Sequence, residues 1–556
     1  MFFREKRTNG RRYLQLVENR YEDGKSRQHV IATLGRMEEL ESSGQLTSLL
    51  ASGARFTQAA MVLSAHRQGE DTQASNRRIG PGLVFARLWK EIGCQAVIDQ
   101  LLRGRAFGFP VERAILLTVI HRLVNPGSDR AASQWMTEHT LEGAISLSLH
   151  HLYRTMAWLG EALGEDEQDG RTPFVPRTTK DLIEEGLFEK RRNLFANLDI
   201  VFFDTTSIYF EGEGGETIGQ RGHSKDSRPD LKQMVVGAVV DSNGVPLCCE
   251  LWPGNTSDVK SLLPIVARLR KRFRVGRICI VADRGMIDAS VMEALETDSD
   301  LQMDYILGAR MRSCNEVKKV VLARPGRYRL VHPEREKAKD PSPLKVKEVR
   351  VGDHRYIVCL NSEQARKDQH DRAAILVSLQ EKLKQGAKSL VGNRGYRRFI
   401  TGEGASFKVD QAAIAREKRY DGKWVLRTTM NLSPKDVAMR YKHLWQVEAL
   451  FRSAKSLLET RPIYHKCDET IRGHVFCSFL ALMLRKELQD RLAARGCHVE
   501  WADLVEDLNK VQETTLEQEG KCFIVRSDMP SLAIKAFQAV GVAIPPRIRT
   551  VEAPVT

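Results

Sequence analysis

The sequence predicts an α/β protein made of several domains. The chain has 556 residues, enough for roughly three or four domains with their own hydrophobic cores. Apolar residues recur with a helical period over residues 79–195, and at Leu198 the pattern changes to short apolar runs typical of buried strands. These runs then alternate with amphipathic segments, which indicates a sheet covered by helices.

The charge balance indicates a polyanionic partner. Lysine and arginine number 86 against 71 acidic residues, a formal net charge of +15. A surplus of this size is typical of proteins that meet nucleic acid, although some proteins are simply basic. The ten cysteines form no C-x-x-C pair and no zinc spacing, and no uncharged run of 18 residues occurs. The composition therefore predicts a cytoplasmic protein without a membrane segment.

Residues 1–75 form the first predicted segment and contain strands. Two strand-like runs flank a Glu-Asp-Gly turn at 22–24, which is a hairpin signal, and a polar linker follows. Residues 79–195 are predicted to be helical and to bind DNA. An Asn-Pro-Gly turn at 125–127, with Arg122 before it, fits a helix-turn-helix, and it fits an ordinary helical bundle equally well.

The next segments are predicted to build one interrupted core. Residues 196–310 read strand, strand, strand, helix, strand, helix, strand, an antiparallel start followed by crossovers. Residues 311–430 interrupt this order and are predicted to form an inserted β-rich subdomain that includes a strand pair around Asp421-Gly422. Residues 431–490 complete the core. Residues 491–556 are predicted to be a helical tail.

A helix that begins at Ser433 organises the second part of the core. Ser433 is a good N-cap, and Pro434 suits the first helical position. Apolar residues then recur every seven positions, which predicts a core-facing stripe. The stripe consists of Val437, Leu444, Phe451 and Leu458. A second series lies about 40° round the helix from the stripe; it consists of Tyr441, Glu448 and Lys455.

Three carboxylates stand out by their positions. Asp204 interrupts an apolar strand, where a buried carboxylate costs several kcal/mol unless it is paired or binds a metal. Asp283 ends a second apolar strand, and Glu448 lies at the edge of the helical stripe. Each of them alone fits a structural role. Together they can hold two Mg²⁺ ions, for which Mn²⁺ can substitute, and such a pair activates a water or a 3′-hydroxyl for phosphodiester transfer.

The order of these carboxylates matches the RNase H-like fold. In that fold the first aspartate lies on the first strand, the second at the fourth strand, and the glutamate on a helix after the fifth. The predicted architecture is therefore an RNase H-like catalytic core interrupted by a mostly β insertion, with a largely helical N-terminal region.

The same residues resemble a known family. The run YKHLWQVEALFRSAK is similar to the Tyr-Arg-Glu-Lys signature of the insertion-sequence DDE transposases that carry a β-rich insertion in the catalytic core. Further segments that look like this family are FDTTS, GHSKDSRPDLKQMVVGAVVDSNGVPL, PGNTSD, VADRGMI and RPIYHKCDETIRGHVFCSFLALML. The resemblance covers residues 198–485 well and the N-terminal third more loosely.

The resemblance implies roles for particular residues. It implies that Asp204, Asp283 and Glu448 are the catalytic, metal-binding triad. It also implies that Tyr441 and Lys455 contact the DNA of the transposon end.

The sequence departs from the family signature at one position. The arginine expected three residues after the tyrosine is Leu444, which belongs to the apolar stripe. Arg452 and Lys442 are the candidates to replace its phosphate contact. Lys225 and Arg228 lie in a polar loop that is expected to line the active site or DNA, or to be a solvated turn.

Other conspicuous residues have simpler interpretations. Trp252 is expected in the core rather than stacked on a base. The histidines at 443, 465 and 474 have no spacing typical of a metal site and are expected to be structural or to face DNA. Arginines and lysines crowd the end of a helix over residues 268–274, where they suit the negative end of the helix dipole.

The expected function is that of an insertion-sequence transposase. It would bind terminal inverted repeats of double-stranded DNA, act as a homodimer on DNA in the bacterial cytoplasm, associated with the nucleoid, and catalyse Mg²⁺-dependent strand cleavage and strand transfer. An RNase H-like nuclease would use the same carboxylates. A catalytically inactive DNA-binding protein derived from a transposase is a further alternative, and a small-molecule phosphotransferase is the most distant one.

Overall fold

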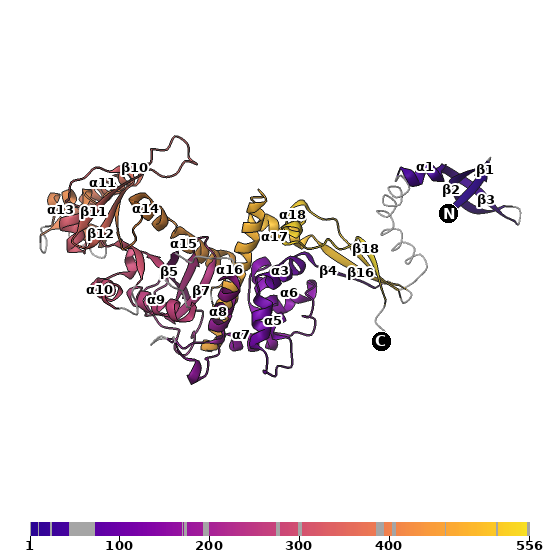
Figure 1. Ribbon diagram of the computed structural model, residues 1–556, viewed down its shortest axis with the longest axis horizontal. Coiled ribbons are helices and arrows are strands. Elements are labelled where there is room, and N and C mark those ends of the chain that lie inside the picture. Colours follow the sequence, from indigo (N-terminus) through magenta and orange to yellow (C-terminus); the bar gives the residue numbers. More distant parts are fainter. Residues whose placement is uncertain are drawn as a thin grey trace. The chain divides into compact units, whose positions relative to one another are not determined.

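The computed structural model shows a mixed α/β protein whose chain divides into two compact units (Figure 1). The first unit is built from Met1–Asn76, Glu513–Ser527 and Pro545–Thr556, and the second from Arg77–Gln512 and Asp528–Ile544. The structure describes the chain except for residues 1, 9, 23–24, 44–72, 170, 172–174, 193–199, 274–277, 299–302, 385–393, 403–406, 462, 519–520 and 553–556.

Antiparallel strands dominate the first unit. The predicted hairpin is confirmed, because β2 (Arg11–Glu22) pairs with β3 (Lys25–Arg36), and β1 (Phe2–Thr8) pairs with β2 on its other side. A four-stranded sheet has the order β18-β17-β16-β4. Its strands are β18 (Ile548–Glu552), β17 (Lys521–Arg526), β16 (Gln512–Gln518) and β4 (Gln73–Arg78). The expectation of a helical C-terminal tail therefore missed three strands, of which β17 pairs with β16 and β18 inside that segment, while β16 also pairs with β4 from much earlier in the chain.

Helices open the second unit, as the periodicity over 79–195 predicts. They are α3 (Gly80–Glu91), α4 (Cys94–Leu101), α5 (Val111–Val124), α6 (Asp129–Glu138), α7 (Leu149–Gly160) and α8 (Thr179–Arg192). Ser128 caps α6 by accepting a hydrogen bond from the Ala131 amide over 3.2 Å. Arg122, the residue that a helix-turn-helix would have offered to DNA, is only 2% exposed and bonds to α16 instead.

The long helix α16 (Asp468–Ala494) is buried along most of its length, as its apolar sequence predicts. It packs against α7 and α5 (Figure 1). Two glycines permit the close approach of α7, since a Cβ at Gly160 would lie 2.1 Å from the Glu469 carbonyl oxygen and one at Gly473 would lie 2.1 Å from that of Met156. Among the described residues, no helix is both long and apolar enough to cross a membrane.

A nine-stranded mixed sheet forms the centre of the second unit, in the order β10-β11-β12-β15-β9-β8-β5-β6-β7. The predicted antiparallel start and parallel crossovers are confirmed, because β5 pairs antiparallel with β6 and parallel with β8, which is parallel to β9. The strands of this half are β5 (Ile200–Tyr209), β6 (Gln233–Asp241), β7 (Pro246–Pro253), β8 (Cys279–Ala282) and β9 (Asp304–Ala309). Trp252, on β7, is fully buried, as expected.

The two faces of this sheet pack against different helices. Val201 and Phe203 face the core built by α9 (Val259–Phe273) and α10 (Ala289–Thr297). Phe202 faces the opposite core, to which α14 (Pro434–Lys442), α15 (Trp445–Arg452) and α16 contribute. This alternation fixes where each polar residue of β5 points.

Residues 311–430 extend the same sheet. Strands β10 (Arg329–His332), β11 (Leu344–Val351), β12 (His354–Leu360) and β15 (Lys423–Thr428) continue it beyond β9. The strand pair expected around Asp421-Gly422 is wrong, because α13 (Gln411–Lys418) precedes the turn and only β15 follows it. β15 instead pairs with β12 and β9, a non-local pairing that the sequence pattern does not reveal.

The basic end of α9 turns partly inward. Arg268 and Arg272 are 2% and 8% exposed and join a buried ion network with α8 and β7. Arg272 donates to Glu184 over 2.6 Å and to Glu250 over 2.9 Å. Ion pairs with buried carboxylates on neighbouring elements, rather than the helix dipole, therefore explain why these two arginines are buried at the end of α9.

Candidate functional site

The two aspartates singled out by sequence lie side by side, Asp204 within β5 and Asp283 directly after the end of β8. The parallel pairing aligns Phe203 with Ala282, so Asp204 and Asp283 occupy the next position of the register. Their neighbours Phe202 and Val281 belong to the core formed with α14–α16. By strand alternation, both carboxylates fall on the sheet face that these helices cover.

Asp204 is held in an electrostatically costly position. Burial raises the pKa of its carboxyl to about 6, and the neighbouring Asp283 and Asp258 carboxylates act in the same direction. Lys225 and the Thr205 amide, which donates to Asp204 Oδ1 over 2.7 Å, oppose the rise. A carboxylate in this state gains from a nearby cation.

Asp258 is a fourth carboxylate at this site, which the sequence analysis did not single out. The Thr205 hydroxyl donates to Asp258 Oδ1 over 2.7 Å, and the Lys225 ammonium lies 3.2 Å from its Oδ2. Lys225 also donates to the Thr205 carbonyl over 2.8 Å. The NTSD run at 255–258, just before α9, was the available sequence signal.

Tyr441 reaches the site from α14. Its hydroxyl donates to Asp283 Oδ1 over 2.7 Å, and burial together with this carboxylate raises the pKa of Tyr441 well above its usual value. Gly308 on β9 leaves the space for the hydroxyl, since a Cβ there would lie 2.6 Å from it. The predicted DNA contact thus directly touches a predicted metal ligand.

Glu448 comes from α15, which packs on β5 and β6. Its side chain is exposed, and among the described residues no hydrogen bond or ion pair holds its carboxylate. The structure therefore joins Asp204 and Asp283 at adjacent strands and leaves Glu448 free on a helix that covers the same sheet face.

The single helix predicted from Ser433 to Leu458 is wrong in one respect. Ser433 caps α14 as predicted, accepting from the Asp436 amide over 3.1 Å, but the helix tightens at His443 and Leu444, where Leu444 N donates to Tyr441 O. After α15 it widens into a π-helical turn over Ser453–Leu457. The predicted stripe is confirmed: Val437, Leu444, Phe451 and Leu458 are all buried.

The predicted DNA contacts lie in different environments. Arg452 is exposed, and Lys442 is half-buried, which lowers its pKa. Arg228 pairs with Asp230 over 2.9 Å. Lys455 is only 12% exposed and contacts Asp226 over 2.7 Å, and burial lowers its pKa.

Two histidines form a cluster with Asp129 that the sequence spacing did not indicate. His465 Nε2 lies 3.3 Å from Asp129 Oδ2 and 3.2 Å from His474 Nδ1. Arg122 Nη2 lies 2.8 Å from the same His474 nitrogen, so a cation already faces its lone pair. The geometry is that of a hydrogen-bonded network between α5, α6 and α16.

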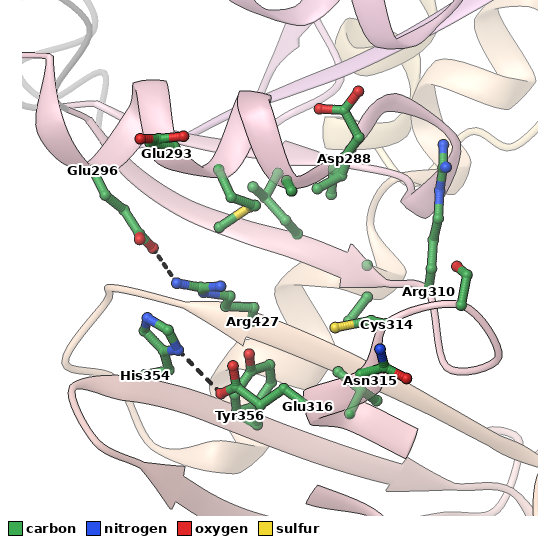
Figure 2. A pocket seen from close by; sticks show the side chains of 18 of the residues that line it. Asp288, Glu293, Glu296, Arg310, Cys314, Asn315, Glu316, His354, Tyr356 and Arg427 are labelled. Carbon is green, nitrogen blue, oxygen red and sulfur yellow. Dashed lines mark hydrogen bonds and ion pairs between the residues drawn. The ribbon is translucent and has the colours of Figure 1, made fainter. Parts of the chain in front are cut away.

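Two cavities flank the loop after Asp283. A cavity of about 300 Å³ is lined by His223, Lys225 and Asp258, together with Gly285 and Arg310. A larger cavity of about 600 Å³ lies between α10 and strands β9, β12 and β15 (Figure 2). Arg310 lines both and donates to the Arg284 and Gly285 carbonyls over 3.0 and 2.9 Å. The smaller cavity is the one lined by the Lys225–Asp258 pair, next to Asp204.

The family assignment agrees with this mixed α/β fold and its paired aspartates. Residues 196–484, more than half of the chain, match the transposase DDE domain, and the chain belongs to this family, whose members catalyse DNA cleavage and strand transfer. Residues 3–66 match the N-terminal domain of IS1634 family transposases. The chain is therefore a DDE transposase of an insertion sequence. No curated protein matches it.

Proposed function

We propose that the catalytic core is RNase H-like and that 311–430 is an insertion within it. The order β7-β6-β5-β8-β9, with only β6 antiparallel to both of its neighbours, supports this assignment. The remaining divisions proposed from the sequence are 1–75, 79–195, 196–310, 431–490 and 491–556. The insertion would then separate Asp283 from Glu448 in sequence.

The proposed active site consists of Asp204, Asp283 and Glu448 as ligands of two Mg²⁺ ions, which Mn²⁺ can replace. Hard oxygen donors suit these ions, and the residues present fit them: two adjacent carboxylates and a third without a partner among the described residues. Bound ions would stabilise the attacking and leaving oxygens of an in-line displacement. Tyr441 would fix the Asp283 carboxylate, while Asp258 and Thr205 would keep Lys225 beside Asp204.

The adjacency of Asp204 and Asp283 on β5 and β8 is the observation that carries this proposal. The protein would bind the inverted repeats at the ends of its element, hydrolyse one strand to free a 3′-hydroxyl, and join it to target DNA. Tyr441, Lys442, Arg452, Lys455, Lys225 and Arg228 are the proposed DNA contacts. Two ends must be handled together, so a homodimer on DNA is expected.

End cleavage tests the proposal. A labelled duplex made from the DNA flanking the gene is mixed with protein, with Mg²⁺ or with EDTA. Glu448→Gln should lower the nicking rate at least about 100-fold, while Glu506→Gln, an exposed carboxylate of α17 (Trp501–Asn509), should not. If wild type and Glu448→Gln bind equally and neither nicks, the protein is instead an inactive DNA-binding relative. Nicking without joining to a target plasmid would indicate a nuclease.

A further inference from the structure

A single carboxylate oxygen gathers two cations next to the proposed site. Asp226 Oδ1 lies 2.7 Å from Lys455 Nζ and 2.6 Å from Arg461 Nη1. The side chains of Asp226 and Lys455 are 7% and 12% exposed, and that of Arg461 is 28% exposed. The second oxygen, Asp226 Oδ2, is buried and has no hydrogen-bond partner among the described residues. A single oxygen of the Asp226 carboxylate therefore pairs with both cations.

Backbone strain occurs on both sides of this contact. Among the non-glycine residues that the structure describes, only Ser227 and Glu459 have a positive φ, at 58° and 44°. Ser227 follows Asp226 directly, and Glu459 lies between Lys455 and Arg461 in the chain. Such conformations are strained and persist where the surrounding structure enforces them, often at functional sites. The two backbone segments that form this contact are therefore both held in strained conformations.

The two segments are tied to the strand that carries Asp204. The Lys225 amide donates to Ser207 Oγ on β5 over 2.7 Å. The Glu211 amide, just beyond β5, donates to the Ile463 carbonyl over 3.1 Å, which anchors the Arg461 segment. The Arg461 and Arg228 guanidinium groups lie 5.7 and 5.5 Å from the Tyr209 ring centroid, at the end of the same strand. The cations therefore stand at a fixed place relative to the aspartates.

We propose that Lys455 and Arg461 form a two-cation clamp for one backbone phosphate of DNA, and that Asp226 occupies the clamp until DNA arrives. A phosphate oxygen accepts the same charge-assisted hydrogen bonds as a carboxylate oxygen, and arginine suits it geometrically. The inference rests on the proposed function in that DNA is the substrate. It adds Arg461 as a DNA contact and Asp226 as a competitor that must turn away when the phosphate binds.

Salt dependence of binding shows whether the two cations share one phosphate. Binding of the end duplex is measured in EDTA over a range of KCl concentrations for Lys455→Gln, Arg461→Gln and the double variant. The slope of log K against log salt is negative, and each lost phosphate contact reduces its magnitude by about 0.9. The clamp predicts that the double variant loses about one such unit, whereas no loss would mean that neither cation binds a phosphate and would overturn the clamp. A loss of about two units would mean separate phosphates and would overturn the clamp.

The variant Asp226→Asn tests whether Asp226 competes with the DNA phosphate for the two cations. It should tighten binding about threefold or more, because a like-charged group no longer opposes the phosphate, and this gain should vanish when Lys455 and Arg461 are both glutamine. Asp226→Glu, which keeps the charge, should bind like wild type. The matched control is Glu213→Gln, an exposed carboxylate paired with Lys232, which is not among the proposed DNA contacts. Unchanged or weaker binding by Asp226→Asn, with wild-type circular dichroism and thermal unfolding, would overturn the proposal.

These measurements are separable from the test of catalysis. They use EDTA and need no cleavage, whereas the proposed active site is tested by nicking in Mg²⁺. Altered salt slopes without any nicking would retain the clamp and reject the catalytic assignment. Nicking that depends on Glu448, with a salt slope unaffected by the Lys455→Gln/Arg461→Gln double variant, would retain the catalytic assignment and reject the clamp.

Discussion

The hydroxyl of Tyr441 donates a hydrogen bond to Asp283 Oδ1 over 2.7 Å, joining α14 to the end of β8 across 158 residues of sequence. The tyrosine lies in a helical segment that also leads to Glu448, so this bond connects the elements that carry the second and third proposed metal ligands. It gives the phenol a structural task at the carboxylate site in addition to its proposed contact with DNA.

Removing the Tyr441 hydroxyl should slow Mg²⁺-dependent nicking and raise the Mg²⁺ concentration that it requires. Tyr441→Phe keeps the ring and deletes only the bond to Asp283, so the rate of Mg²⁺-dependent nicking should fall about 10- to 100-fold, with a higher Mg²⁺ requirement. Nicking rates over a Mg²⁺ titration measure both effects. Tyr464→Phe, which alters a tyrosine that is 67% exposed, is the control. Equal rates at every Mg²⁺ concentration would contradict the role assigned to the bond.

Gly308 should resist substitution because of the same tyrosine. A Cβ at this position would lie 2.6 Å from the Tyr441 hydroxyl and 2.9 Å from the Arg284 amide nitrogen. Gly308→Ala should therefore cost about 1–3 kcal/mol of unfolding free energy, measured by chemical denaturation. Combining it with Tyr441→Phe should recover part of this loss. Gly108→Ala, where the added carbon meets open space, should change little; a similar loss there would show that the contact is not the cause.

The metal-free protein should lose stability as the Asp204 carboxyl ionises. Its pKa of about 6 lies above the ordinary value of 3.8, so the native state binds more protons than the unfolded state between these values. Stability should thus fall as the pH rises through 6, by at most about 3 kcal/mol. In EDTA, Asp204→Asn should melt at a higher temperature than wild type at pH 7.5, and this advantage should be absent at pH 4. A wild type that is the more stable at pH 7.5 would contradict the assigned burial.

The buried ion network should tolerate no loss of Arg272. Arg272→Met leaves Glu184 and Glu250 buried and short of a partner, which should cost about 3–5 kcal/mol of unfolding free energy. Lys271→Met on the same helix removes an exposed pair with Asp169 and should cost less than about 1 kcal/mol. Chemical denaturation of the two variants measures the difference. Equal losses of unfolding free energy would mean that the buried network contributes no more to stability than the exposed pair.

Local patterns predicted much of the core. The strand order from β5 to β9, the buried helix α16, the cap at Ser433 and the apolar stripe were all visible, because each depends on spacing within one segment. The fourth carboxylate, Asp258, was missed because its contacts, Thr205 and Lys225, are far away in sequence. The pairing of β15 with β12 and β9 was missed for the same reason.

The sequence by itself determined the α/β class, the order of the three proposed ligands and the family to which the chain belongs. These depend on residue types and their order, which folding does not alter. Only the tertiary structure decided that Asp226 lies against Lys455, 229 residues away, and that Tyr441 reaches Asp283 through the space left by Gly308. Such contacts depend on strand register and helix packing, which arise from many weak interactions summed over the whole core.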